Sequence, residues 1–382
     1  MPELRIANGR VLLPGSDPVV TDLHLADGRI AAIGEPGRGM TIDARGLLVL
    51  PGIVDIHGDA FERQVQPRPG VGFPMDLALA DTEAQLLANG ITTEFHGITL
   101  SWEPGLRSPD AWRAVIAALN ARAWTCDMRV HLRFEAFNLD ALDQAEADIA
   151  AGHVHLLAFN DHTPAIARKV NDPVAGAKYS DRAGMDLPAF QALVARVTAR
   201  APDVVAGRQR LARAARAAGI PIASHDDDTI TTRETFRAEG ARICEFPIAQ
   251  AVGEAARAAG DAVVMGSPNV VRGGSHLGWM SAATLAEAGV CDVLASDYFY
   301  PAMARAAMIL AGRGVLDLPS SWALVSANPA RATGLTDRGT IEAGKRADIV
   351  LMDPGSHAIV ATIAQGRIAH LTAEAAGRLR AG

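Results

Sequence analysis

The chain has 382 residues, of which 49% are hydrophobic and 21% are charged, the composition of a soluble globular protein with one large domain and room for a smaller one. A formal net charge of −7 provides no basic field, so we expect no nucleic-acid partner. Cys126, Cys244 and Cys291 form no Cys-x-x-Cys pair, which indicates free thiols in a reducing compartment. Without an apolar signal core or a membrane-length apolar run, we expect a cytoplasmic protein that does not contact a membrane.

The sequence at both ends of the chain is typical of short strands joined by tight turns. In residues 1–50, Asn8-Gly9 is a strong hairpin signal, and residues 335–382 have a similar pattern. We therefore expect one small accessory β-sandwich built from both ends, with a larger domain, residues 51–334, inserted between them.

The middle of the chain alternates apolar strand-like runs with alanine-rich helical runs, several of which end at a glycine that would cap the helix. Eight strands that alternate with helices over about 280 residues are typical of a (β/α)8 barrel. A doubly wound open sheet is the alternative, but the first strand is not followed by the Gly-x-Gly-x-x-Gly fingerprint of dinucleotide binding. The expected strands are residues 48–56, 92–100, 128–134, 154–159, 221–224, 241–246, 262–266 and 292–296.

The first barrel strand ends in the sequence LPGIVDIHGD, which places His57 and Asp59 two residues apart and on one side of the strand. A single His-x-Asp is more often a polar turn than a metal site. Here, however, polar residues end the later strands as well, and in a barrel these ends share one face. They are Glu94, His96, His131, Arg133, Glu135, Asn160, Asp161, His162, His225, Asp226, Asp227, Asp228, Glu245, Asn269, Arg272, His276 and Asp297.

This mixture of imidazoles and carboxylates indicates a metal-dependent hydrolase with one or two divalent ions, zinc first, with manganese or iron as alternatives. A lone terminal aspartate such as Asp297 can accept a proton from the attacking water. Some of these residues have a structural interpretation that we favour. We expect His131 to be a buried, satisfied histidine, and residues 226–228 to cap the following helix, with one of them at most near the site.

Basic residues near the same face suggest an anion site. Arg68 lies in a stiff loop after the first strand, and Arg272 precedes two glycines whose backbone N–H groups could meet an anion. Lys178 and Tyr179 lie in the stretch 161–185, which is long for a loop and would suit a lid. A surface salt bridge is the alternative for each basic residue taken alone. As a set they would suit a phosphorylated small-molecule substrate.

The motifs LPGIVDIHGD, QPRPGVGFP, VHLRFE, IASHDDDT, MGSPNVVRGGSH and ASDYFYPA span most of the chain. With them the sequence resembles the amidohydrolase superfamily and, within it, the α-D-ribose 1-methylphosphonate 5-triphosphate diphosphatase family of phosphonate breakdown. The resemblance implies hydrolysis of a ribose 5-triphosphate to the 5-phosphate and pyrophosphate, and it allows a homodimer. By motif position, it implies as metal ligands His57, Asp59, Glu135, His225, Glu245 and Asp297.

In this interpretation Asp297 is also the base, and His162 or His276 protonates or positions the leaving group. The triphosphate would be held by Arg68, Lys178, Tyr179, Asn269 and Arg272.

The sequence departs from this family at the site itself. Gly58 and Ala60 stand where threonine and asparagine are typical, and Glu94 and His96 stand where smaller or apolar residues are typical. An amide or cyclic-imide hydrolase, or an enzyme acting on another phosphorylated sugar or nucleotide, is therefore the alternative function. A binding protein that kept the barrel without turnover is a more distant one.

Overall fold

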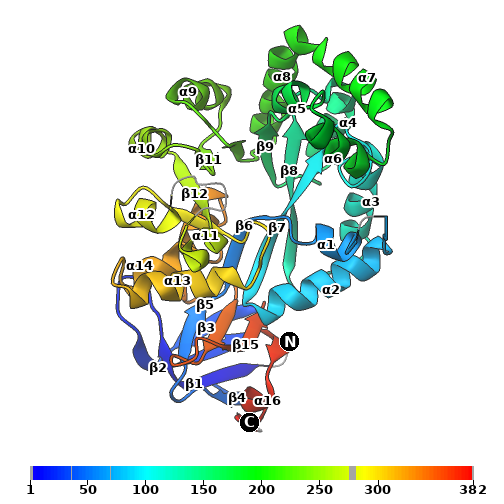
Figure 1. Ribbon diagram of the computed structural model, residues 1–382. Helices are drawn as coiled ribbons and strands as arrows, with labels where there is room; N and C mark the ends of the chain where they lie inside the picture. Colours follow the sequence, from blue (N-terminus) through cyan, green and yellow to red (C-terminus); the bar gives the residue numbers. More distant parts are fainter. Residues whose placement is uncertain (1–2, 36, 69, 275–280, 381–382) are drawn as a thin grey trace.

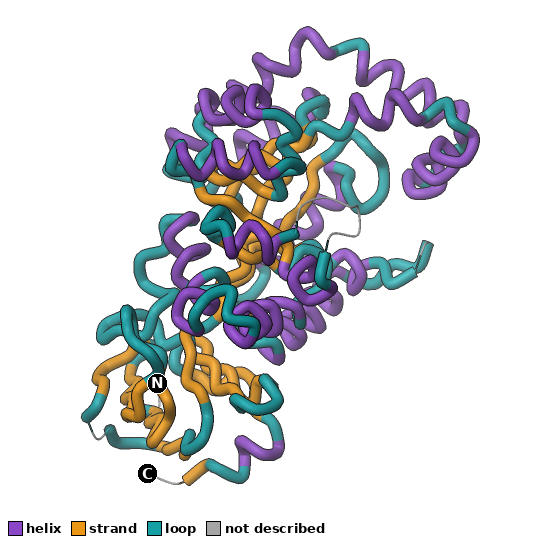
Figure 2. The backbone as a smooth tube through the Cα atoms, turned by 60° about the vertical axis from the view of Figure 1, so that its left-hand side comes forward, coloured by secondary structure: helices purple, strands orange, loops and turns teal. Residues whose placement is uncertain are grey.

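The computed structural model describes residues 3–35, 37–68, 70–274 and 281–380. The described strands form two sheets, one of eight strands and one of nine. In Figure 1 the eight-stranded sheet lies in the body of the molecule with helices around it, and the other sheet lies at one end together with both termini. Figure 2 shows the same separation from another side.

The eight-stranded sheet is parallel and follows the sequence order from β6 to β13. Its first and last strands meet through a parallel bridge between Gly58 and Asp297. There the Asp297 backbone N–H donates to the His57 carbonyl at 2.9 Å. The (β/α)8 barrel expected from the sequence is therefore confirmed. Its strands are β6 (Ile53–Gly58), β7 (Ile91–Leu100), β8 (Asp127–Glu135), β9 (Leu156–Asn160), β10 (Ile222–His225), β11 (Ile243–Glu245), β12 (Ala262–Gly266) and β13 (Val293–Ala295).

The strand expected over residues 48–56 is two strands. β5 (Leu48–Pro51) belongs to the end sheet and β6 to the barrel, so the chain crosses from one sheet to the other at Gly52. A β-carbon at Gly52 would lie 2.4 Å from Oγ1 of Thr92, so only glycine fits this crossing. One continuous apolar run therefore serves two sheets.

Helices connect the barrel strands, and the glycines expected to end several of them have positive φ, for example 77° at Gly90 and 69° at Gly219. The helices outside the stretch after β9 are α1 (Glu62–Val65), α2 (Met75–Ala88), α3 (Pro109–Asn120), α4 (Leu142–Ala150), α9 (Ile230–Glu239), α10 (Gln250–Ala258), α11 (Ser267–Arg272), α12 (Ala282–Glu287), α13 (Ala302–Gly312), α14 (Leu318–Ala323) and α15 (Ala327–Ala332).

The stretch after β9 was expected to be a long loop, and this was wrong. It contains α5 (Thr163–Lys169) and α6 (Pro173–Ala183), followed by α7 (Leu187–Thr198) and α8 (Val204–Ala217). The Asp172 side chain caps α6 by accepting from two backbone N–H groups, a local signal that the sequence did carry. α5, α6 and α7 pack on one another through buried Ile166, Ala183 and Phe190.

The end sheet draws on both ends of the chain, as expected. β5 pairs parallel with β1 (Leu4–Val11) and antiparallel with β14 (Ile349–Met352). The other strands are β2 (Val19–Ala26), β3 (Arg29–Ile33), β4 (Met40–Asp43), β15 (Ile359–Ala364), β16 (Arg367–Leu371) and β17 (Leu379–Arg380), and α16 (Ala373–Ala376) lies among them. None of the described helices combines the length and apolarity needed to cross a bilayer.

Candidate active site

Three side chains from three barrel strands meet in the interior of the barrel mouth: His57 of β6, His131 of β8 and Glu245 of β11. We call them the inner group. Nδ1 of His57 lies 3.0 Å and Nε2 of His131 lies 3.8 Å from Oε2 of Glu245. All three side chains are essentially inaccessible to solvent. The facing atoms, including both carboxylate oxygens, have no hydrogen-bond partner among the described residues.

The inner group fits a divalent metal, because two imidazole nitrogens and a carboxylate are a typical ligand set and buried polar atoms need a partner. Burial, followed by the positive charge of Arg133, lowers the pKa of His57, and burial lowers the pKa of His131 to about 3. Both rings are therefore neutral at physiological pH, as metal ligands must be. Nδ1 of His131 lies 3.0 Å from the Ile56 carbonyl, which orients the ring so that Nε2 faces Glu245.

Three further side chains form an outer group nearer to solvent: His162 after β9, and His225 and Asp226 at the end of β10. Nδ1 of His225 lies 3.2 Å and Nε2 of His162 lies 4.0 Å from Oδ2 of Asp226. In the described part of the chain, the inner and outer groups are the two places where such side chains could share a metal. The outer group is partly exposed.

Asp226 reaches the outer group because its backbone turns into the left-handed region, with φ at 58°. The expectation that residues 226–228 cap the next helix was wrong: Thr229 caps α9, and its side chain accepts from Thr232 N–H. Asp227 is buried and bonds instead to Ser224 and Arg233.

Arg133 lies between the two groups. It follows His131 by two residues on β8, so both side chains enter the same side of the barrel. Nη1 of Arg133 lies 3.4 Å from Oδ2 of Asp59, and Nη2 lies 3.2 Å from Nε2 of His225. Two residues expected as metal ligands, Asp59 and His225, thus face a guanidinium.

Glu135 is two residues further along β8, and its carboxylate is engaged by the start of α5. It accepts from the backbone N–H and the hydroxyl of Thr163 at 3.2 and 2.7 Å and from the backbone N–H of His162 at 3.3 Å. Its Oε2 also lies 3.4 Å from Nδ1 of His162. Glu135 therefore holds His162 at the mouth of the barrel.

Asp297 stands at the end of the last strand with φ at 56°, beside the bridge that closes the barrel. Burial, followed by the negative charge of Asp59, raises the pKa of Asp297 to about 7. A carboxylate with a pKa near 7 can both accept and return a proton at physiological pH.

The residues expected to hold an anion are more dispersed. Arg68 and Lys178 are exposed, and the Tyr179 ring stacks on Phe190 with centroids 6.4 Å apart. Arg272 donates to the Tyr298 hydroxyl at 3.3 Å, which keeps it near the turn after Asp297. Oδ1 of Asn269 accepts from the backbone N–H of Ala282 at 2.9 Å and so joins α11 to α12. His276 lies outside the described residues.

The two unusual features at strands one and two are coupled in space. A β-carbon at Gly58 would lie 2.1 Å from Oε1 of Glu94, 2.9 Å from Oγ of Ser296 and 3.1 Å from Oδ2 of Asp55. We call Asp55, Glu94 and Ser296, which gather over Gly58, the seam cluster. Oδ1 of Asp55 accepts from the backbone N–H groups of His57 and Ser296 at 3.2 and 3.1 Å. The cluster thus supports the backbone on both sides of the barrel closure, and Gly58 provides the space for Glu94.

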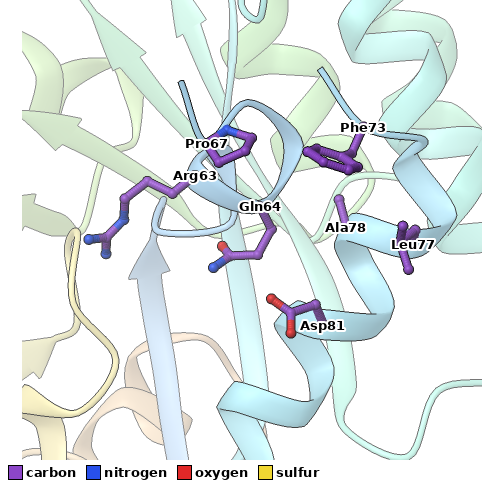
Figure 3. Close-up of a pocket in the computed structure, with 7 residues that line it drawn as sticks. All are labelled: Arg63, Gln64, Pro67, Phe73, Leu77, Ala78 and Asp81. Atoms are coloured by element: carbon purple, nitrogen blue, oxygen red, sulfur yellow. The ribbon is translucent and has the colours of Figure 1, made fainter. Parts of the chain in front are cut away.

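A pocket of about 390 Å³ lies in the connection after the first barrel strand (Figure 3). It is lined by Arg63 and Gln64 of α1 and by Leu77, Ala78 and Asp81 of α2, together with Pro67 and Phe73. No member of either candidate ligand group lines it. The residues that line the pocket therefore follow the first barrel strand in the sequence, but the pocket does not contain the candidate metal ligands.

The structure brings His131, Arg133 and Asp226 to the centre, whereas sequence reasoning gave His131 and Arg133 no role there and allowed at most one of residues 226–228 near the site. For the first two a signal was present, since alternation along residues 131–135 places His131, Arg133 and Glu135 on one side of the strand. For Asp226 the deciding feature is a backbone turn that its sequence neighbours do not specify.

The sequence matches the amidohydrolase family over residues 204–373. It is 32% identical over 356 residues to the α-D-ribose 1-methylphosphonate 5-triphosphate diphosphatase of Escherichia coli K12, covering 91% of this chain and 94% of that protein.

Solved structures support the fold. Dihydropyrimidinase from Brevibacillus agri has a TM-score of 0.62 at 15% identity, covering 97% of this chain and 95% of that one. A β-aspartyl dipeptidase from Fervidobacterium islandicum has a TM-score of 0.63 at 15% identity, covering 97% of both chains. The chain therefore belongs to the amidohydrolase superfamily and, within it, to the α-D-ribose 1-methylphosphonate 5-triphosphate diphosphatase family.

Proposed function

We propose that the protein is a zinc-dependent diphosphatase that hydrolyses α-D-ribose 1-methylphosphonate 5-triphosphate to the 5-phosphate and pyrophosphate. The observation that carries this proposal is the 32% identity to the Escherichia coli enzyme over nearly the whole length of both proteins. The inner group and a proton-accepting Asp297 support the hydrolytic part of the proposal.

The inner group, His57, His131 and Glu245, would hold the metal. A divalent ion in such a site lowers the pKa of water and polarises a phosphoryl oxygen. Zinc is the metal that we propose, because imidazole and carboxylate ligands in a buried site suit it.

The chain's own residues account for the proton. Asp297, at the bridge that closes the barrel, accepts the proton of the attacking water at its carboxylate. His162 lies at the partly exposed edge of the site, where Glu135 positions its ring. There it can donate a proton to, or hydrogen-bond, the departing pyrophosphate.

The first experiment measures pyrophosphate release from a panel of ribose and nucleoside 5-triphosphates by the metal-loaded protein. We expect release from the ribose 1-methylphosphonate 5-triphosphate, and its loss in Asp297→Asn with metal still bound. Asp186→Asn is the matched control, because Asp186 only caps α7 through the Ala189 N–H and asparagine also caps helices.

Two outcomes would contradict the proposal. Full turnover by Asp297→Asn would remove Asp297 as the base. No release from any triphosphate, with metal bound, would favour the amide or cyclic-imide hydrolase alternative, and a panel of such substrates would then be tested.

A further inference from the structure

Arg133 is a buried cation at the centre of the site, with a side-chain exposure of 9%. It donates toward Asp59 with Nη1 and toward His225 with Nη2, at 3.4 and 3.2 Å. Gly97 on the adjacent strand leaves room for the Arg133 side chain, since a β-carbon at Gly97 would lie 3.2 Å from Cδ of Arg133. The guanidinium therefore joins the last residue of β10 to the turn after β6.

This arrangement opposes a second metal ion. The contact with Arg133 uses Nε2 of His225, and it uses one carboxylate oxygen of Asp59. A guanidinium is always protonated, and a dication beside it would meet like charge where water screens little.

The inner and outer groups also differ in burial and in the contacts that their side chains make. The nitrogen and oxygen atoms that face one another in the inner group have no hydrogen-bond partner in the described part of the chain, so they are available to bind a metal ion. The outer group is partly exposed, and Arg133 engages Nε2 of His225 and Glu135 engages His162, which leaves Nδ1 of His225, facing Asp226, without a hydrogen-bond partner among the described residues. The inner group therefore offers a divalent ion three buried side chains, whereas the outer group is open to solvent and lies beside Arg133.

The guanidinium of Arg133 has N–H groups that the contacts with Asp59 and His225 do not use. Arginine carries five N–H donors, and the contacts with Asp59 and His225 use two of them. Nε of Arg133 is buried and has no partner among the residues described. Arginine is suited to phosphate because its planar fork can donate two parallel hydrogen bonds.

We propose that Arg133 supplies the second positive charge of the centre: the protein binds one divalent ion, on His57, His131 and Glu245, and the guanidinium replaces a second ion and binds a phosphoryl oxygen of the substrate. The substrate-binding half rests on the proposed diphosphatase function, whereas the metal count does not.

The first test counts metal. Protein loaded with excess Zn²⁺ or Mn²⁺ and then desalted should carry one ion per chain by elemental analysis. Arg133→Met, which frees Asp59 and His225, should carry two. Two ions per chain in the unchanged protein, or one ion in Arg133→Met, would overturn the exclusion of a second metal.

The second test measures binding of inorganic pyrophosphate to the zinc-loaded protein by calorimetry, with the metal content checked afterwards because pyrophosphate itself binds zinc. We expect the dissociation constant to rise at least tenfold in Arg133→Met and to recover in part in Arg133→Lys. Arg129→Met is the matched control. It removes the same side chain from the same strand, where Arg129 bonds to Asp127 at 3.0 Å, away from the centre.

The outcomes separate the two proposals. Unchanged pyrophosphate affinity in Arg133→Met, with hydrolysis of the triphosphate intact, would overturn the role of Arg133 and leave the proposed function standing. No triphosphate hydrolysis by the unchanged protein would overturn the proposed function, while the metal count would still decide whether Arg133 replaces a second ion.

Discussion

Two buried polar clusters contact His57, and they differ in how Asp55 of the one and Glu245 of the other are used. In the seam cluster, Oδ1 of Asp55 accepts two backbone N–H groups, from His57 and Ser296, whereas both oxygens of Glu94 have no hydrogen-bond partner among the described residues. In the inner group, neither oxygen of Glu245 accepts a hydrogen bond from the described residues. Both clusters are fully buried, so burial alone does not distinguish a structural carboxylate from a ligand.

The difference shows what a buried charge needs. A carboxylate that receives backbone donors is stabilised by the fold itself, and it stabilises the backbone in return. Glu245 has no donor among the described residues, and burial raises the pKa of Glu245, so a proton or a cation must balance its charge. Asp55 therefore supports the barrel closure, and the inner group has side chains that could bind a divalent metal.

The largest effect that we expect is on metal affinity. Glu245→Gln removes the negative charge of the inner group but keeps its shape, so zinc affinity should fall by more than about 100-fold, the upper range for changes to residues that only support a ligand. Zinc titration with thermal unfolding as the readout would measure this, because a bound metal raises the unfolding temperature.

Glu239→Gln is the matched control for this change, since Glu239 is a buried glutamate that pairs with Arg208 outside the centre. If Glu245→Gln bound zinc as tightly as the unchanged protein, the distinction between the two clusters would be lost.

The second effect concerns the seam cluster. Gly58→Ala places a methyl group 2.1 Å from Oε1 of Glu94, and such overpacking costs about 1–3 kcal/mol of unfolding free energy. Glu94→Ala should relieve this, so the double variant is more stable than the sum of the single changes predicts, with a coupling of about 0.5–3 kcal/mol. Urea unfolding of the four proteins gives the cycle.

Gly312→Ala is the control for this cycle, because a β-carbon at Gly312 meets nothing within 4 Å among the described atoms. Additive effects of Gly58→Ala and Glu94→Ala would show that the two positions are independent and would break the interpretation of the seam cluster as one unit.

The third effect depends on pH. Burial, followed by the charge of Asp55, raises the pKa of Glu94 well above its ordinary value of 4.5. Above pH 4.5 the unfolded chain loses this proton while the folded chain keeps it, so the contribution of Glu94 to stability falls as pH rises toward the folded-state pKa. Glu94→Gln lacks this dependence.

The stability of Glu94→Gln relative to the unchanged protein should therefore rise with pH above 4.5, by at most about 1.4 kcal/mol per pH unit. Urea unfolding at a series of pH values would measure it. A difference that stays constant with pH would mean that Glu94 is ionised in the folded state and that the seam cluster holds its charge without a proton.

Much of the architecture could be predicted because its signals are local. Alternating strands and helices with glycine caps predicted the barrel, and each barrel strand was placed to within about two residues of its structural bounds at nearly every end. The crossing at Gly52 was missed, because an apolar run that continues through two sheets has no local signal for where it changes sheet.

The site was harder to predict than the fold. The strand ends identified the candidate site residues, but which of these side chains contact one another depends on residues far apart in the sequence. His131 was expected to be satisfied, and the structure places its free Nε2 at Glu245, which comes from a strand far along the chain. The long stretch 161–185 was interpreted as a loop because its helices are short and polar, and packing on α7 stabilises them.

The sequence by itself determined the barrel, the accessory sheet and the chemical character of the mouth, because hydrophobic periodicity and residue type are properties of short segments. Only the tertiary structure decided which side chains share a centre: that Arg133 faces Asp59 and His225, and that Gly58 makes room for Glu94. These are contacts between separate strands, and their register and barrel closure bring them together.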